Sequence, residues 1–426
     1  MIPRADPPLD AGCPIGKTGW RLVIELFYNP DQAMRFGLLT FGAESFGQYT
    51  GAPPTTERWV DHTSIIYGGF ISRGNLRPNI DEPVDEFTFD MLDPAGDWVD
   101  WRPPESLSSP NLNTPVRVGL INTNVEPGTY YTMYQGRVER LLDTHDDPVR
   151  NITFESYGTK SDLVTSLLQP KRPRETALAR INAILSQIGW ENGYDDSWPP
   201  PNFTTTMLEA DGEIRYDEEA TAYSIIQEAA VSCGYHVGIT RLGEFRVHPI
   251  IDPQEPPTIV FADCYQEGVT DIDAIATSIE FVSDSSEVLN VVQLINKRFP
   301  QQSAQAIDAQ SIARWGRRAD GYGFPAYIAN DSSGQTQTLA NQIVAASANI
   351  VNRVERVTFN TLTDPNWWTA FLKMEIGETV TVRRYKPRLI EFRCTIIGID
   401  WVLSEAGYIE GNINLSTLEE TLKGAV

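Results

Sequence analysis

The fold is decided by two runs of sequence, VDEFTFDMLDPAGDW (84–98) and PVRVGLINTNVEPGTYYTMYQGRVERLLDTHDDPVRNITFESYG (115–158). In the first run, Phe87, Phe89 and Met91 alternate with polar residues, which is the period of a half-buried strand. The letters DPAG then supply turn residues. This run therefore predicts a strand that ends in a tight turn.

The second run repeats the pattern. Apolar residues alternate again over 116–120 and 152–154, with turn residues between them. The segments 130–134 and 136–142 are expected to form a bent strand pair with Gly136 at the bend, since glycine in a strand often marks a bend. Five or so strands at this spacing predict a small antiparallel barrel or sandwich.

Length and charge set the class of protein. A chain of 426 residues is too long for one ordinary core, so two to four domains are expected. The 41% of apolar residues favours a folded chain. The net charge of −23 argues against a protein that binds duplex DNA through a positive face. It is compatible with a surface that repels DNA, with high solubility, or with a carbohydrate or cation partner.

The cysteines and the N-terminus indicate no special chemistry. Cys13, Cys233, Cys264 and Cys394 lie far apart, and we interpret them as small hydrophobic residues rather than a disulfide framework or a zinc site. The first residues lack the apolar core of a secretory signal, and no apolar run of 18 residues predicts a membrane span.

The first 80 residues are expected to join the opening stretch as one β-rich domain. Residues 1–19, rich in proline and glycine, are predicted to be a mobile or draped arm. Residues 11–18 fit a loose Walker A pattern, but a P-loop follows a buried strand and opens a helix, whereas here prolines precede and a strand follows. A plain loop is therefore the preferred interpretation. Further strands are predicted at 22–28, 36–41 and 63–72.

The middle of the chain changes to a mixed α/β pattern. Its predicted elements are a helix over 163–168 capped by Ser161 and Asp162, amphipathic helices over 177–188 and 221–233 with Gly234 as the C-cap of the second, a hairpin over 235–247 with its turn at Leu242 and Gly243, and a strand over 259–261.

The pattern after residue 270 returns to β with one long inserted helix. The predicted elements are strands over 277–281, 288–295, 357–360, 379–382 and 392–403, a short helix over 306–315, a loop over 316–325, and a helix capped at 331–333 that runs through Val354. The apolar residues change phase beside Gly398, which predicts a bulge.

The order of these segments resembles a known family. It runs F-x-F-x-(L/M)-x-D-x-x-G-x-W, P-V-R-V, Y-x-x-Y-x-G-x-V and (V/I)-x-F-x-(S/C)-x-(G/D), followed by a short helix. This order resembles that of minor tail proteins of long-tailed actinobacterial phages, of the baseplate-hub type. With the hairpin at 235–247 and the letters EIGETVTV at 375–382, the resemblance spans about 80–405. The first run and its continuation carry it through Phe87, Phe89, Gly96, Trp98, Val116, Arg117, Val118, Tyr134, Gly136, Val138 and Phe154.

The resemblance implies a mostly β fold with an α+β part. Two tube-like antiparallel β-barrel domains, at 20–158 and 271–405, would flank a mixed α/β domain at 159–270, with an N-terminal arm at 1–19 and a C-terminal segment at 406–426. It further implies a homotrimer at the tail tip of a siphophage virion, made in the host cytoplasm. The implied partners are the distal tail protein or tail tube ring, other minor tail proteins and the tape-measure protein. DNA would be met only in transit, and no stable membrane insertion is implied.

Each residue that could carry chemistry also has a structural interpretation, which we prefer. The four histidines, His62, His145, His236 and His248, show no metal-binding spacing. The acidic run 143–147 could hold a cation but suits a solvated turn, and the acidic run 216–219 suits the N-terminal end of the helix after it.

Two aromatic sites could bind or cleave a glycan. Asp195 and Asp196 lie beside Trp198, as a glycosidase carboxylate and a sugar platform could, although a plain loop is preferred. Trp367 and Trp368 are the best candidates for sugar stacking, although packing in a core or an interface is preferred. We therefore predict no catalytic, cofactor-binding or metal-binding residue, no cofactor and no enzyme activity. The alternative function is a tail-associated cell-wall hydrolase or glycan-binding receptor protein, and a third is an adaptor that anchors fibres or the tape-measure protein.

Overall fold

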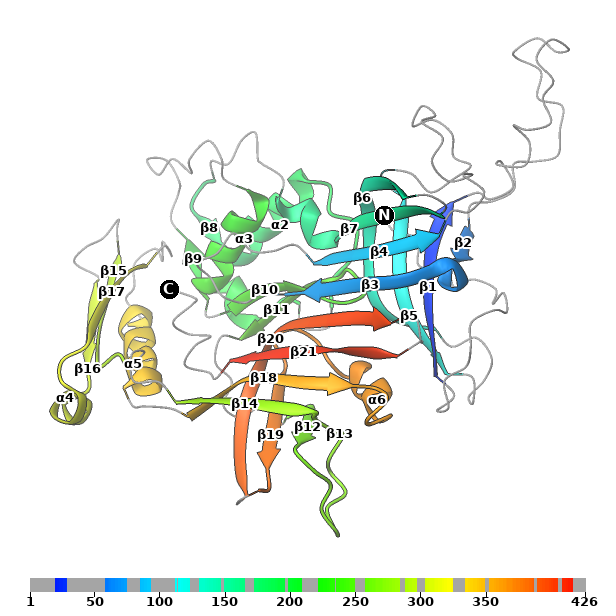
Figure 1. Cartoon of the computed structure of the whole chain (residues 1–426). Coiled ribbons are helices and arrows are strands. Elements are labelled where there is room, and N and C mark those ends of the chain that lie inside the picture. The colour runs from blue at the N-terminus through cyan, green and yellow to red at the C-terminus, as the bar shows by residue number, and fades with distance from the viewer. Residues whose placement is uncertain are drawn as a thin grey trace, which may run out of the picture. The chain divides into compact units, whose positions relative to one another are not determined.

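The computed structural model of the protein (Figure 1) describes eighteen stretches of the chain. They are residues 20–28, 58–74, 85–92, 112, 114–122, 130–146, 149–164, 172–195, 198–208, 221–233, 235–249, 257–283, 288–296, 303–324, 334–348, 352–386, 389–404 and 408–416. The chain divides into two compact units. Unit 1 comprises Met1–Ile71, Asp85–Thr159 and Trp401–Ile409, and unit 2 comprises Ser72–Val84, Lys160–Asp400 and Glu410–Val426.

Unit 1 is built on a ladder of β-strands. Its elements are β1 (Trp20–Tyr28), β2 (Arg58–Asp61), η1 (Thr63–Ile65), β3 (Ile66–Arg73), β4 (Glu86–Leu92), β5 (Pro115–Asn122), β6 (Tyr130–Asp146) and β7 (Val149–Gly158). The strands follow the order β3-β4-β7-β6-β5-β1-β2, and all pairings from β4 to β2 are antiparallel. The predicted antiparallel β character is therefore confirmed. Among the described residues no pairing joins β2 back to β3, so closure into a barrel stays a prediction.

The alternation that predicted β4 is also the pattern of its burial. Phe87, Phe89 and Met91 are all fully buried, whereas the residues between them are only partly buried. Phe89 lies directly opposite Phe154 on β7, and their rings stack with centroids 4.8 Å apart. Such cross-strand aromatic pairs are the unit of sheet stabilisation, so the opening stretch forms the core of unit 1.

Strand β6 corrects one prediction. It is a single strand of 17 residues and not a bent pair, and it includes Asp143 to Asp146, which were expected to lie in a turn. Its register on β7 shifts between Val138 and Arg140, beyond Gly136. A Cβ placed on Gly136 would lie 2.4 Å from the carbonyl oxygen of Tyr157. Glycine is therefore required at this position because the neighbouring strand approaches closely.

Substitution of Gly136 by alanine is expected to destabilise unit 1 by about 1–3 kcal/mol, the cost of overpacking a rigid site. The carbonyl that the new methyl group meets belongs to the backbone of β7 and cannot rotate away. Gly68→Ala on β3 is the matched control, because nothing lies within 4 Å of a Cβ at that position. Urea denaturation of both variants measures the difference. Equal stabilities would contradict the close-approach explanation.

The first part of unit 2 combines helices with short strands. Its elements are η2 (Thr159–Val164), β8 (Glu175–Thr176), α2 (Ala177–Gln187), η3 (Pro201–Thr204), β9 (Met207–Leu208), α3 (Ala222–Val231), β10 (Tyr235–Ile239) and β11 (Phe245–Pro249). The predicted helices at 177–188 and 221–233 and the hairpin are confirmed. Residues 159–164 form the 3-10 helix η2, whereas residues 165–168 of the helix expected over 163–168 and the expected C-cap Gly234 lie outside the described residues.

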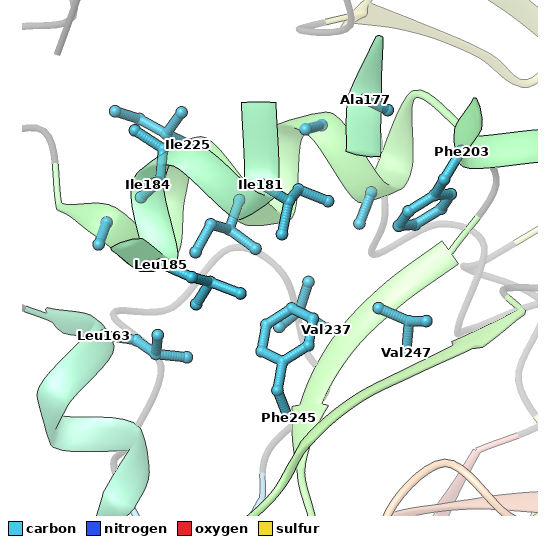
Figure 2. Close-up of a cluster of buried hydrophobic side chains, with 14 of the residues drawn as sticks. Leu163, Ala177, Ile181, Ile184, Leu185, Phe203, Ile225, Val237, Phe245 and Val247 are labelled. Carbon is cyan, nitrogen blue, oxygen red and sulfur yellow. The ribbon is translucent and has the colours of Figure 1, made fainter. Parts of the chain in front are cut away.

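These helices pack on the hairpin through one apolar cluster (Figure 2). Ile181 and Ile184 of α2 and Ile225 of α3 are fully buried, and Phe245 and Val247 face them from β11. Thr176 begins α2 as its N-cap, because its side chain accepts a hydrogen bond from the amide of Ala179 at 3.2 Å. The helices and the hairpin therefore share one core.

The second part of unit 2 is a mixed sheet. Its strands are β12 (Ile259–Ala262), β13 (Ala274–Ile275), β14 (Ser278–Ser283), β18 (Asn352–Asn360), β19 (Thr379–Arg384), β20 (Ile390–Ser404) and β21 (Ile409–Ser416). Strand β12 pairs in parallel with β13 and β19, whereas the pairs β19–β20, β14–β18 and β18–β21 are antiparallel. The short helix α6 (Trp367–Phe371) precedes β19. Burial supports the predicted change of phase in β20, since residues 396–399 are all buried in succession.

A three-stranded sheet with two helices lies between β14 and β18 in the chain. It consists of β15 (Val291–Asn296), β16 (Ala304–Ile307), α4 (Ala309–Trp315), β17 (Ala319–Phe324) and α5 (Gln335–Ser347). The loop expected over 316–325 is wrong, because residues 319–324 pair in parallel with β15. The long helix expected to reach Val354 is also too long, because it ends at Ser347 and Val354 is fully buried in β18 opposite Phe281. None of the described helices is long and apolar enough to cross a membrane.

Candidate functional site

Unit 1 holds a buried ion pair between two neighbouring strands. Arg117 on β5 donates from Nε to Glu25 Oε2 on β1 at 2.6 Å, and both residues are less than 5% exposed. The guanidinium of Arg117 also lies between two aromatic rings, 4.3 Å from the centroid of Trp59 and 4.1 Å from that of Tyr130. Burial raises the pKa of Glu25, and burial with the nearby Glu25 raises the pKa of Tyr130. The cluster joins β1, β5 and β6 electrostatically.

A second buried network, in unit 2, centres on Glu375 in the turn before β19. Its Oε2 accepts from Arg73 Nη2 at 3.0 Å, and its Oε1 accepts from the amide of Arg241 at 2.9 Å. The side chain of Arg241 donates to the carbonyl oxygen of Phe371 at 3.1 Å. Arg73 Nη2 also lies 3.4 Å from the carbonyl oxygen of Ile239. Glu375 therefore ties the β10–β11 hairpin to the segment that leads into β19.

Two residues further along, the same turn meets the hairpin again. Gly377 has a φ of +90°, and a Cβ on it would lie 2.6 Å from the imidazole of His248. Arg246, two residues before His248 on β11, lies 3.3 Å from Glu378 and 3.5 Å from Asp195. We call these contacts of Glu375, Gly377 and Glu378 with the β10–β11 hairpin the latch.

The latch encloses a pair of buried histidines. His236 and His248 are paired across the hairpin, with ring centroids 5.8 Å apart. Nδ1 of His236 lies 3.0 Å from the side-chain nitrogen Nε2 of Gln227 on α3. Among the described residues, neither ring nitrogen of His248 has a hydrogen-bond partner. Burial holds the pKa of His248 well below its usual value, and the neighbouring His236 and Arg246 act in the same direction.

The structure places several of the residues that could have carried chemistry. Within the described part of the chain, no group of three His, Cys, Asp or Glu residues is arranged to hold a metal ion. Asp195 pairs with Arg246, and the ring of Trp198 packs edge-on against Phe203 and Phe245. Asp195 and Trp198 therefore make structural contacts, and their preferred interpretation as loop residues stays a prediction. Asp196, the acidic run 216–219 and the Walker-like residues 11–18 lie outside the described residues.

The tandem tryptophans are core residues. Trp367 is fully buried and Trp368 is 4% exposed, so neither presents a ring face to a sugar. Beside them, Asp364 accepts hydrogen bonds from the hydroxyl of Tyr265 at 2.9 Å and from the amide of Ile275 at 2.6 Å. This carboxylate is therefore occupied in fixing the loop before α6.

Sequence reasoning did not identify the latch. Its partners lie far apart in the chain, since Arg246 and Glu378 are separated by 132 residues. The letters EIGETVTV were noted only for their resemblance to tail proteins. Their two glutamates around a glycine were the available signal, because buried acids need partners and a conformationally free glycine permits close approach.

The fold is shared with solved structures of phage tail proteins. The tail protein from Neisseria meningitidis MC58 superposes with a TM-score of 0.55 and 12% identity, over 95% of this chain and 99% of its own. The 43 kDa tail protein of prophage MuSo2 from Shewanella oneidensis gives a TM-score of 0.57 and 10% identity, over 94% of this chain and 99% of its own. The prophage tail protein gp18 from Listeria monocytogenes EGD-e aligns with a TM-score of 0.45 and 12% identity, over 85% of this chain and 91% of its own. No protein-family model and no curated protein sequence matches the chain.

Proposed function

We propose that this protein is a structural component of a bacteriophage tail. The observation that carries the proposal is the extent of the shared fold, which covers 95% and 94% of this chain and 99% of each of two tail proteins. A match over whole chains supports a shared architecture rather than one common domain. The burial of Trp367 and Trp368 bears on the alternative, because their rings offer no platform for a sugar.

The narrower proposal is a tail-tip, or baseplate, hub. Its support is the order of sequence motifs from Phe87 to Phe154, which resembles that of hub proteins. In this proposal the chain forms a homotrimer in which domains at 20–158 and 271–405 act as the tube-like parts, with the domain at 159–270 between them. The hub continues the tail tube, binds the distal tail protein or tube ring, and anchors other minor tail proteins and the tape-measure protein. The actinobacterial host rests on the sequence resemblance alone.

The strong negative charge suits a channel through which DNA passes. A lumen lined with carboxylates repels the phosphate backbone, so that DNA in transit does not adhere to the wall. The net charge of −23 supplies the carboxylates that such a lining needs. This part of the proposal would fail if the acidic residues of the assembled hub faced outward.

The mass of the purified protein in solution tests the trimer, and labelling of virions tests the location. Light scattering is expected to give three times the chain mass of 47.6 kDa. Gold-labelled antibody is expected to mark only the distal end of the tail. A monomer would contradict the trimer, and label along the tail shaft would contradict the hub. Clearing of host cell walls in zymograms would favour the alternative, a tail-associated hydrolase or glycan-binding protein.

A further inference from the structure

In the latch, three arginine side chains pair with the carboxylates of Glu375 and Glu378, close to the uncharged side chain of His248. His248 lies on β11. Its imidazole is near His236 on β10 and near Arg246 on the same strand. From the turn it meets Gly377, whose neighbours Glu375 and Glu378 pair with Arg73, Arg241 and Arg246. Asp195 also lies 3.5 Å from Arg246, so that three arginines meet three carboxylates around the neutral His248. Protonation of His248 would add a positive charge between Arg246 and the turn that no further carboxylate offsets.

The closed site is too tightly packed to solvate a charged His248. The residue is 4% exposed, and its ring is so close to Gly377 that a single added carbon would lie 2.6 Å away. On the other side, a Cβ on Gly238 would lie 3.4 Å from Cε1 of the ring. Water therefore cannot solvate an imidazolium in the closed site, and a buried charge without a partner is strongly unfavourable.

We propose that the latch is acid-sensitive: protonation of His248 releases the β10–β11 hairpin from the Glu375–Glu378 turn, while the sheet of unit 2 stays folded. The inference rests on the contacts within unit 2 and does not depend on the proposed role in a phage tail. It gives the fold a local opening that a drop in pH controls. Histidine suits this role because its ordinary pKa, about 6.5, lies just below neutrality.

The direction of the effect follows from proton uptake. In the open latch His248 is solvated and binds a proton below about pH 6.5, whereas in the closed latch it stays neutral to a much lower pH. Opening is therefore coupled to the uptake of one proton, and acid favours the open form. Glu378 acts in the opposite direction, because burial raises its pKa in the closed form and its protonation there relieves the cost of burying a carboxylate. Opening prevails in the proposal because the carboxylate of Glu378 has Arg246 as its counter-charge in the closed latch, whereas a charged His248 would have no hydrogen-bond partner there among the described residues.

Hydrogen–deuterium exchange of the full chain at pH 7.5, 6.5 and 5.5, corrected for the intrinsic exchange rate, tests the proposal. Amides of residues 235–249 and of the turn at 372–378 are expected to lose protection together, by about fivefold between pH 6.5 and 5.5. Amides of β14 and β18 in the same unit are expected to keep theirs. A flat protection profile for the latch amides over this range would overturn the proposal, as would an equal loss in β14 and β18.

Three variants distinguish the effect of protonating His248 from a general loss of stability. His248→Phe cannot be charged and is expected to remove the pH dependence of latch protection. His62→Phe, which removes a buried histidine from unit 1, is the matched control and is expected to retain it. Glu375→Gln is expected to lower latch protection at every pH without changing the fivefold step, and it keeps the test valid if His248→Phe does not fold. A fivefold step that survived in His248→Phe would overturn the proposal.

Discussion

Replacement of Arg117 by methionine is expected to lower the free energy of unfolding of unit 1 by about 3–5 kcal/mol. Methionine keeps most of the packing volume between Trp59 and Tyr130 but removes the partner of Glu25, a carboxylate that is only 3% exposed. A buried charge left without its partner is far more costly than the absence of the whole pair. Native-state hydrogen exchange of the β5 amides at neutral pH measures the loss.

The dependence on pH and two further variants make this prediction specific. The deficit of Arg117→Met is expected to shrink as the pH falls through the raised pKa of Glu25, since the protonated acid carries no charge. Adding Glu25→Leu is expected to restore most of the stability. Arg140→Met is the matched control, because Arg140 is 61% exposed in its pair with Glu155 and such surface pairs contribute less than about 1 kcal/mol. Equal losses in the buried and exposed variants would contradict the argument.

Substitution of Trp367 by alanine is expected to cost about 3–5 kcal/mol in unit 2. The indole is fully buried, with its ring centroid 5.0 Å from each of Phe261 and Phe359. Its Nε1 donates to the carbonyl oxygen of Ile275 at 2.8 Å. Alanine would leave both a large cavity and an unsatisfied carbonyl group, and the penalties of the two add. Urea denaturation followed by circular dichroism measures the loss.

Two comparisons separate these contributions. Trp367→Phe retains an aromatic ring and loses the hydrogen bond, so it is expected to cost about 1–3 kcal/mol. Leu362→Ala, in the turn just before α6, is the control, because Leu362 is 68% exposed and its truncation is expected to change stability by no more than about 0.5 kcal/mol. A Trp367→Ala variant as stable as Leu362→Ala would show that the tryptophan is not a core residue.

The elements that sequence predicted well are those whose pattern is local. Phe87, Phe89 and Met91 alternate because one face of β4 is buried, and the apolar residues of α2 recur at helical spacing for the same reason. The helix at Gln335–Ser347 was predicted too long because apolar residues continue through Val354 at helical spacing. Val354 is instead held in β18 by pairing with β14, and such pairing between distant segments overrides local periodicity.

The candidate site was beyond sequence reasoning for a related reason. The two glutamates around Gly377 are the local signal, but they do not show which distant segment pairs with them. Their burial follows from the approach of a hairpin more than 120 residues earlier in the chain. The loop predicted over 316–325 was wrong for a similar reason. Gly321 and Gly323 favour a loop locally, but both residues lie in β17, where they pair with β15.

The composition of unit 1 has a consequence for biosynthesis. Its last segment, Trp401–Ile409, contributes buried residues, and Leu403 lies 3.2 Å from where a Cβ of Gly69 would be. Unit 1 therefore lacks part of its core until the ribosome has synthesised residues 401–409, more than 240 residues after Thr159. While translation continues, the early strands would expose apolar side chains and unpaired edges, which are prone to aggregate. Unit 2 likewise needs β21, which pairs with β18, so a fragment that ends before residue 401 would lack part of the core of both units.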